Sequence, residues 1–248
     1  MDEFLFNLFG VEEFHSETNS RLRFWFKHIR DNALKDDGNI FEFGVYRGAS
    51  LIAVALILRE LGSKKEVYGF DSFEGLPTYS QYDELENFFK YKEKYFDEKF
   101  IDKYELFLKT KEKVTGINEF SASTISTQGD FSNTSYESTV EKIEFFELEN
   151  IEIIKGSFAD TVEKFFGDYN QTISSANIDC DLYDSYRICL PLIYEYLFEG
   201  GHVHLDEYYS MKFPGAKIAC DNFFEEKNIT PRKNQNRKGE FERWYFTK

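Results

Sequence analysis

A strand, a glycine turn, a helix and a second strand follow one another between residues 39 and 71, and this run constrains the fold more than any other feature. Asn39–Phe43 is a short apolar run of β-forming residues, and a turn bounded by two glycines follows it. Residues 49–61 are apolar over the length of a helix, and residues 66–70 form the second strand. A helix that connects two strands in this way makes them parallel, so the pattern predicts an α/β fold with an open parallel sheet.

The alternation of helices and strands returns in the second half of the chain. Helices are predicted at 138–146, 160–166, 185–197 and 216–226, and strands at 151–154, 172–178 and 202–205. Two short β-like runs, around Ile229 and at 241–246, predict an antiparallel pair at the sheet edge, with the polar stretch 232–238 as the loop between them. We therefore expect a mostly parallel central sheet with helices on both faces and an antiparallel C-terminal strand pair.

All 248 residues are expected to form one domain with two additions to the sheet. Residues 1–38 are amphipathic and predicted to be helical, with packing positions at Leu22, Phe24, Trp25, Phe26 and Ile29. Residues 79–130 are rich in charged and aromatic side chains and predict a helical insertion that ends in a loop. An insertion at the carboxyl end of a strand can act as a lid. A solvated appendage or a contact within a homo-oligomer fits the same composition.

The composition restricts the classes of partner. The formal net charge is −15, which argues against nucleic acids and anionic membranes, because general binding to both depends on cationic side chains. Cys180, Cys189 and Cys220 form no C-x-x-C pair, and their odd number fits a reducing compartment better than a disulfide framework. The first ten residues are acidic, unlike a secretory signal, and the longest apolar run, Leu51–Leu58, is too short to span a membrane. We expect a soluble protein of the cytoplasm.

Carboxylates end four of the five predicted parallel strands, at the edge of the sheet where ligands bind. Glu42, Gly44 and Gly48 form the pattern E-x-G-x-x-x-G, which differs from the G-x-G-x-x-G that binds a pyrophosphate. An acid at the first position suits a ligand with a cationic amino group. Asp71 lies about 20 residues beyond the turn, where nucleoside-binding folds hold the ribose. The set predicts a nucleoside with a cationic tail, such as S-adenosylmethionine.

Three further acids predict a metal site. Asp179, Asp206 and Glu207 follow two of the strands and offer only oxygen ligands. Oxygen ligands suit Mg²⁺, and also Mn²⁺ or Ca²⁺, rather than Zn²⁺. Acids so placed would repel one another unless a cation lay between them. The sequence therefore predicts a divalent cation at this edge of the sheet.

Five segments that occur in order resemble the macrocin O-methyltransferase (TylF-like) family. They are EFGVYRGAS, YGFDSFEGLP, KGSFADT, NIDCDLYDSYRICLPLIYEYLFEGGHVHLDEYY and PGAKIACDNFF. The resemblance extends from residue 39 to residue 226 and is interrupted by the insertion. It implies a Rossmann-like class I methyltransferase fold, S-adenosylmethionine as the cofactor and Mg²⁺-dependent methylation of a sugar hydroxyl.

The resemblance also implies a role for individual residues. Those at the methionine end of the cofactor would be Glu42, Gly44, Arg47, Gly48 and Ser50. Those near its ribose and adenine would be Asp71, Ser72, Phe73, Gly156, Ser157 and Phe158. The metal ligands would be Asp179, which also adjoins the cofactor, with Asp206 and Glu207, and the general base would be Asp181. Where the family has a second aspartate, Glu207 keeps the charge and adds a methylene group.

We therefore expect an Mg²⁺-dependent O-methyltransferase that acts on a sugar or a sugar-containing small molecule. A precursor of a bacterial surface glycan, a nucleotide-linked sugar and a natural-product glycoside all fit as acceptors. An NAD(P)-dependent Rossmann oxidoreductase would explain Asp71 but not the acid cluster, and a non-catalytic scaffold would not need that cluster. His202 and His204 either pack in the core or face the site, and Cys180 is predicted to pack at the end of its strand.

Overall fold

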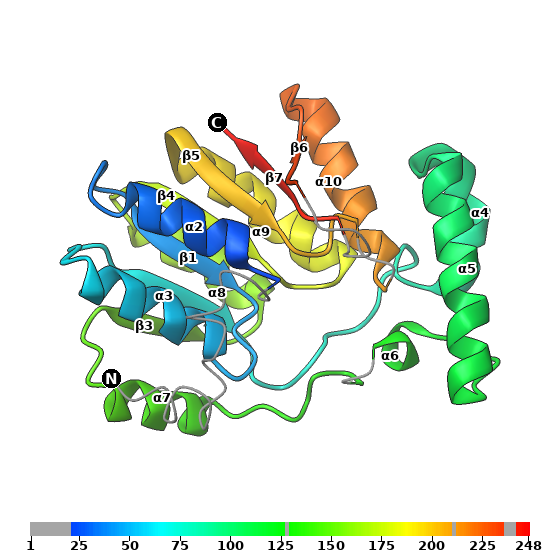
Figure 1. Ribbon diagram of the computed structural model, residues 1–248, viewed down its shortest axis with the longest axis horizontal. Helices are drawn as coiled ribbons and strands as arrows, with labels where there is room; N and C mark the ends of the chain where they lie inside the picture. The colour runs from blue at the N-terminus through cyan, green and yellow to red at the C-terminus, as the bar shows by residue number, and fades with distance from the viewer. Residues whose placement is uncertain (1–20, 127–128, 210–211, 236–241) are drawn as a thin grey trace.

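The computed structural model describes residues 21–126, 129–209, 212–235 and 242–248. Within these residues, seven strands form one sheet in the order β3-β2-β1-β4-β5-β7-β6 (Figure 1). The parallel strands are β1 (Asn39–Phe43), β2 (Val67–Asp71), β3 (Ile151–Lys155), β4 (Ile173–Ile178) and β5 (Leu197–Leu205). The antiparallel strands are β7 (Trp244–Thr247), which pairs with β5, and β6 (Arg232–Lys233), which pairs with β7. The predicted α/β fold with an antiparallel C-terminal pair is confirmed.

Helices cover both faces of this sheet. On one face lie α2 (Arg23–Asn32) and α3 (Ala49–Glu60), and on the other lie α8 (Phe158–Asp168), α9 (Tyr183–Tyr196) and α10 (Pro214–Lys227) (Figure 1). The apolar run Leu51–Leu58 is buried along its whole length, because α3 packs against the sheet, against α2 and against the end of α7 (Tyr136–Phe145). Among the described residues, no helix is both long and apolar enough to cross a membrane.

The N-terminal helix α2 is fixed on the middle of the sheet. Trp25 Nε1 donates a hydrogen bond to Ser175 Oγ on β4 at 2.9 Å, and the His28 ring stacks on His202 of β5 with 4.2 Å between centroids. Of the predicted packing positions, Phe24 is half-buried and the others are buried: Leu22, Trp25, Phe26 and Ile29. The first twenty residues of the predicted helical segment lie outside the described residues.

The insertion forms two long helices and a short third one, α4 (Leu85–Tyr95), α5 (Glu98–Thr115) and α6 (Ala122–Ile125). α4 and α5 lie side by side at one side of the sheet (Figure 1) and are linked by a hydrogen bond of 3.1 Å from Lys92 Nζ to Glu105 Oε1. Their apolar side chains pack on Leu182, Tyr209 and Phe213, which follow β4 and β5. The insertion therefore lies at the carboxyl edge of the sheet, where a lid would have to be, and its role stays a prediction.

The prediction for the start of the C-terminal strand pair is wrong in position. Ile229 N–H donates to Phe224 O and closes the end of α10, with Asn228 in the left-handed conformation, so Ile229 belongs to no strand. β6 forms instead at Arg232 and Lys233, where the sequence predicted a loop. Hydrogen bonds to β7 make these two residues a strand, and local propensity does not reveal such pairing.

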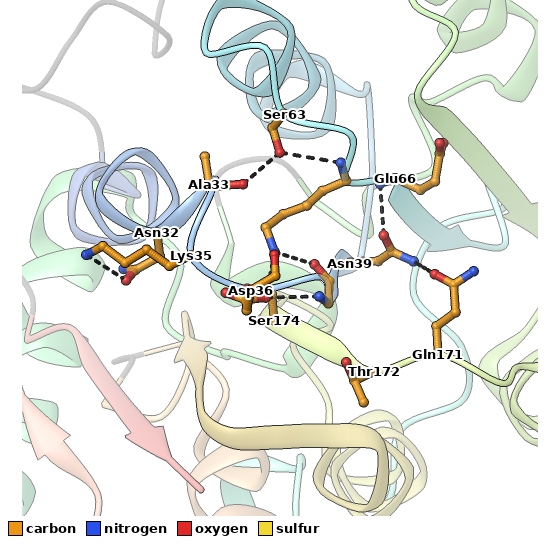
Figure 2. A network of polar contacts seen from close by, with 12 residues as sticks. Asn32, Ala33, Lys35, Asp36, Asn39, Ser63, Glu66, Gln171, Thr172 and Ser174 are labelled. Atoms are coloured by element: carbon orange, nitrogen blue, oxygen red, sulfur yellow. Dashed lines mark hydrogen bonds and ion pairs between the residues drawn. The ribbon is translucent and has the colours of Figure 1, made fainter.

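A buried lysine joins several elements at the amino-terminal edge of the sheet. Lys65 is 4% exposed, and its Nζ donates to Asp36 Oδ1 at 2.5 Å, to Asp36 O at 2.7 Å and to Gly38 O at 2.6 Å. Ser174 Oγ donates to the other carboxylate oxygen of Asp36 at 3.1 Å (Figure 2). This network ties the segment before β1 to the beginnings of β2 and β4.

Candidate active site

The turn between β1 and α3 packs directly against the end of β4. Gly44 has a φ of 96°, and a Cβ atom at this position would lie 1.9 Å from the carbonyl oxygen of Asp179. Gly48 has a φ of 81°, and its Cβ atom would lie 2.6 Å from Thr139 Cγ2 on α7. A side chain at either position would combine a steric clash with an unfavourable backbone conformation. The backbone of the turn therefore requires both glycines of the predicted pattern.

Asp71, at the end of β2, organises this turn. Its Oδ2 accepts hydrogen bonds from the N–H groups of Val45 and Tyr46, both at 2.8 Å. Its Oδ1 accepts a hydrogen bond from Phe73 N–H at 2.7 Å, and its carbonyl oxygen accepts one from Gly156 N–H at 2.9 Å. A carboxylate has about four lone-pair positions. Backbone donors fill three of them, so one position on Oδ1 is left for a ligand.

Glu42, on β1, is fully buried beneath the turn. Asn177 Nδ2 donates to Glu42 Oε1 at 3.0 Å, whereas Glu42 Oε2 and Asn177 Oδ1 have no hydrogen-bond partner among the described residues. Burial raises the pKa of Glu42 to about 8, although hydrogen bonds from Ser50 and Asn177 act against this rise. A ligand amino group would supply the missing donor. Arg47, by contrast, is exposed and donates from Nε to Asn133 O at 3.0 Å.

The predicted ribose and adenine residues line the ends of β2 and β3. Ser72 Oγ accepts the backbone N–H two residues further on at 3.2 Å, and Phe73 packs edge-on against Tyr136 with 5.5 Å between ring centroids. Ser157 caps α8 by accepting the backbone N–H three residues further on at 3.2 Å, and Phe158 is the first residue of that helix. Of the predicted nucleoside-end residues, Asp71 contacts the glycine turn directly, and its carbonyl oxygen accepts the N–H of Gly156.

Three carboxylates meet beyond the ends of β4 and β5. Asp179, Asp181 and Glu207 offer oxygen atoms that all lie within 4.8 Å of one another. Burial, together with the charges of Glu207 and Asp179, raises the pKa of Asp181 well above its ordinary value. Burial also raises the pKa of Asp179 to about 6, although Arg21 lowers it, and the charge of Asp206 adds to the rise. The structure thus places two predicted metal ligands next to the predicted base.

Asp206 is held by arginine. Arg21 Nη1 contacts Asp206 Oδ2 at 2.6 Å, and Arg21 Nη2 contacts Asp179 Oδ2 at 2.6 Å. Burial alone would raise the pKa of Asp206, but Arg21 and then Arg243 lower it below its ordinary range. Asp206 Oδ1 has no hydrogen-bond partner among the described residues, and Arg243 Nη1 and His204 Nε2 lie 3.8 Å and 3.9 Å away.

This arrangement differs from the predicted ligand set in one respect. The sequence grouped Asp206 with Asp179 and Glu207, whereas the structure groups Asp181 with these two residues. Asp206 and Glu207 are consecutive and directly follow β5, in a bend. Asp206 meets Arg21, and Glu207 lies beside Asp181.

Asp181 reaches the cluster through an uncommon backbone conformation. Its φ is 59°, and Leu182 N–H donates to Cys180 O at 2.6 Å across a three-residue turn. Such a conformation is unfavourable for a residue with a Cβ atom, and it is found mainly where the surrounding structure requires it. Here it directs the Asp181 carboxylate back towards Asp179, while Cys180 between them packs in the main core, as predicted.

Comparison with known proteins agrees with this geometry. Residues 41–208 match the family described as "Methyltransferase domain", over a stretch that includes the glycine turn and all four acids. The chain belongs to this methyltransferase family. No curated protein matches the chain significantly. The narrower resemblance to macrocin O-methyltransferases stays a prediction.

Solved structures of methyltransferases share the fold. The O-methyltransferase NovP is 21% identical over 89% of this chain and 78% of NovP, with a TM-score of 0.61. The calicheamicin methyltransferase CalS11 is 19% identical over 100% of this chain and 80% of its own, with a TM-score of 0.61. The Bacillus cereus O-methyltransferase in complex with SAH is 13% identical over 99% of this chain and 90% of its own, with a TM-score of 0.53.

The sequence gives no indication of the role of one buried tyrosine next to the acid cluster. Tyr186, in the first turn of α9, is fully buried, and its hydroxyl donates to Ile178 O at 2.7 Å. The same hydroxyl accepts a hydrogen bond from Glu207 N–H at 3.2 Å. Tyr186 therefore links the end of β4, which precedes Asp179, to the end of β5. The only hint of this role in the sequence is that Tyr186 lies a few residues after Asp179. An aromatic residue at that place is otherwise typical of a helix that packs in the core.

Replacing Tyr186 by phenylalanine is expected to loosen the acid cluster. The change leaves the buried Glu207 N–H without this acceptor, whereas Ile178 O keeps its hydrogen bond from Asp206 N–H, so the free energy of unfolding should fall by about 1–3 kcal/mol. Affinity for Mn²⁺ should also fall, because Glu207 loses one of the hydrogen bonds that position it. Urea denaturation and calorimetry measure the two effects. The variant Tyr196→Phe, which removes a hydroxyl that donates to Phe166 O at 2.7 Å, is the control and should leave Mn²⁺ affinity unchanged.

Both histidines of β5 are packed in the core of this methyltransferase. His202 stacks between His28 and Tyr245, with 4.2 Å and 4.9 Å between ring centroids. His204 is fully buried, and burial lowers its pKa to about 4. Its Nε2 lies 3.9 Å from Asp206 Oδ1, so His204 adjoins the acids while being uncharged near neutral pH.

Proposed function

We propose that this methyltransferase transfers a methyl group from S-adenosylmethionine to a hydroxyl group of a sugar or sugar-containing small molecule, with a divalent cation at the acid cluster. The observation that carries the proposal is the close approach of Gly44 to the backbone of Asp179, because it supports a cofactor turn that adjoins the acid cluster. A methyl donor and an acceptor hydroxyl must lie in contact for the transfer, and holding them in place removes roughly 7–11 kcal/mol from the barrier.

The residues present fit S-adenosylmethionine. The free lone-pair position on Asp71 Oδ1 suits a ribose hydroxyl, and the buried Glu42 Oε2 suits the amino group of the methionine tail. The proposed residues at the methionine end are Glu42, Gly44, Arg47, Gly48, Ser50 and Asp179, and those at the nucleoside end are Asp71, Ser72, Phe73, Gly156, Ser157 and Phe158. When bound, the cofactor supplies an electrophilic methyl group on its sulfonium.

The donor set also fits Mg²⁺ or Mn²⁺. It consists of carboxylate oxygens, and Asp206 Oδ1 is buried without a hydrogen-bond partner among the described residues, as a ligand atom for a cation would be. We propose Asp179, Asp206 and Glu207 as the metal ligands. When bound, the cation lowers the pKa of an acceptor hydroxyl that contacts it.

Asp181 is the proposed general base. Its carboxylate lies within 4.8 Å of the oxygens of Asp179 and Glu207, so it adjoins the place proposed for the acceptor hydroxyl. Burial and these two acids raise its pKa, which makes the ionised carboxylate a stronger proton acceptor than an exposed aspartate. The Asp181 carboxylate would take the proton of the acceptor hydroxyl, whose oxygen would then accept the methyl group that the bound cofactor supplies, with the demethylated cofactor as the leaving group.

Two observations support a sugar as the acceptor. CalS11 is described as a TDP-rhamnose 3'-O-methyltransferase, and this chain has its fold. Tyr183 follows Asp181 by two residues in the sequence, and its ring packs on Tyr82 of the insertion with 4.3 Å between ring centroids. Aromatic faces are suited to the apolar faces of sugar rings. The oxidoreductase alternative is not favoured, because the matching family is a methyltransferase family.

Calorimetry followed by an activity assay tests the proposed function. S-Adenosylmethionine and its demethylated product should bind, and NAD⁺ should not. Transfer of a labelled methyl group should then appear with a nucleotide sugar or a sugar glycoside from a panel of acceptors, and it should require Mg²⁺ or Mn²⁺. NAD⁺ binding without S-adenosylmethionine binding would contradict the proposal in favour of the oxidoreductase, and binding of neither would favour the scaffold.

A further inference from the structure

The guanidinium group of Arg21 lies in the gap between two of the proposed metal ligands. Each of its terminal nitrogens contacts a different carboxylate at 2.6 Å, Asp206 through Nη1 and Asp179 through Nη2. Asp179 follows β4 and Asp206 follows the neighbouring strand β5, and their side chains are only 13% and 1% exposed, respectively. Two carboxylates that are largely withdrawn from solvent and share one partner need a positive charge between them. In this structure the chain itself supplies that charge.

The contacts use one carboxylate oxygen of each aspartate, and a divalent cation shared by the two acids would need oxygens of the same two carboxylates. Arg21 occupies Oδ2 of both aspartates, and an arginine side chain has only donors and keeps its charge. Mg²⁺ binds carboxylate oxygens at about 2.0–2.1 Å. A cation at this position and the guanidinium would therefore compete both for the oxygen lone pairs and for the space between the carboxylates.

The position of Arg21 allows its side chain to move away from the two aspartates while helix α2 stays in place. The Arg21 side chain is 42% exposed, so a rotation would carry its charge to solvent rather than into the core. The next residue, Leu22, is fully buried, and Trp25 is held by its hydrogen bond to Ser175 on β4. α2 can therefore stay on the sheet while the guanidinium moves.

We propose that Arg21 is a resident counter-ion that competes with the divalent cation for Asp179 and Asp206. It neutralises the two acids when no cation is bound, and it leaves the gap before Asp206 becomes a metal ligand. The inference deepens the proposed function and rests on its metal site. It also explains why the three carboxylates that lie close enough together to hold a cation are those of Asp179, Asp181 and Glu207, and why Asp206 is not among them.

Mn²⁺ binding to the cofactor-free protein tests the competition. Removing the competitor by Arg21→Gln should tighten Mn²⁺ binding about tenfold if the guanidinium occupies the gap roughly nine-tenths of the time, because the apparent affinity scales with the fraction of protein that is free to bind. Arg21→Lys keeps the charge but loses the two-pronged contact, so its affinity should fall between those of Arg21→Gln and the unchanged protein. Calorimetry, or electron paramagnetic resonance of free Mn²⁺, gives the dissociation constants.

Arg243→Gln is the matched control for a general effect of charge. Arg243 Nη1 lies 3.8 Å from Asp206 Oδ1 and donates to Asp206 O at 3.2 Å, so it is a second arginine near the same acid that does not bridge the two carboxylates. Its replacement should tighten Mn²⁺ binding clearly less than Arg21→Gln does. Adding Asp206→Asn to both the unchanged protein and Arg21→Gln should shrink the effect of the arginine substitution, because one of its two carboxylate partners is gone.

The outcomes separate this inference from the proposed function. Unchanged or weaker Mn²⁺ binding by Arg21→Gln overturns the competition while leaving the metal site in place. Equal tightening by Arg243→Gln also overturns it, since charge alone would then explain the result. If neither the unchanged protein nor Arg21→Gln binds Mn²⁺, both the competition and the proposed metal site are wrong.

Discussion

Replacement of Asp181 by asparagine should lower kcat by about 10²–10⁴-fold, the usual contribution of a positioned general base. The amide has the same shape as the carboxylate but cannot take a proton from the acceptor hydroxyl. Binding of S-adenosylmethionine should be unchanged, because Asp181 is not among the residues of the glycine turn. A methyl-transfer assay at saturating acceptor, with calorimetry for the cofactor, measures both quantities.

Asp184→Asn is the control for Asp181→Asn. Asp184 lies three residues further on, its side chain is 48% exposed, and it pairs with Arg187 at 2.9 Å on the surface of α9. Its replacement removes the same charge without touching the cluster, so kcat should stay near its original value. Asp181 is not the base if the two variants turn over at the same rate as the unchanged protein.

Replacement of Lys65 by methionine should lower the free energy of unfolding by about 3–5 kcal/mol, the usual cost of breaking a buried ion pair from one side. Lys65 donates to Asp36 Oδ1, Asp36 O and Gly38 O, and the lysine and aspartate side chains are only 4% and 15% exposed. Methionine fills the space but leaves Asp36 with an uncompensated charge at the amino-terminal edge of the sheet. Urea denaturation at neutral pH measures the change.

Two further variants make the Lys65 result specific. Lys64 is exposed, so Lys64→Met should change the free energy of unfolding by no more than about 0.5 kcal/mol. The double variant Lys65→Met with Asp36→Asn should recover part of the loss, because it leaves no buried charge without a partner. Equal stabilities of Lys65→Met and Lys64→Met would show that the buried pair contributes nothing.

Much of the candidate site could be predicted because it belongs to short segments at strand ends. The turn from Gly44 to Gly48 could be recognised from its two glycines. Their positive φ angles and the close approach of Gly44 to Asp179 both require glycine. Asp71 could be found by its separation in sequence from the turn. Asp179, Asp206 and Glu207 could be found because they directly follow β4 and β5. In each case a local pattern and the geometry of parallel sheets were sufficient.

Residues that reach the site from packed helices, or from the turn directly before one, could not be predicted. Arg21 contacts Asp179 across 158 positions of sequence, and its own segment shows only a helical pattern that buries Trp25 and Ile29. Tyr186 looks like any aromatic residue on the inner face of a helix. Their roles depend on how α2 and α9 pack on the sheet. This packing is determined by contacts between residues far apart in the sequence, which a short stretch of sequence does not reveal.

The amino-acid sequence by itself determined that this chain builds a parallel α/β sheet with a glycine turn and a row of acids at one edge, because strand, turn and helix preferences act over a few neighbouring residues. Only the tertiary structure decided which acids meet. Asp181 joins Asp179 and Glu207 through its left-handed backbone, and Asp206 turns to Arg21. The directions of side chains at a strand end follow from register, backbone turn and the charges brought near by other elements, and these exist only once the chain has folded.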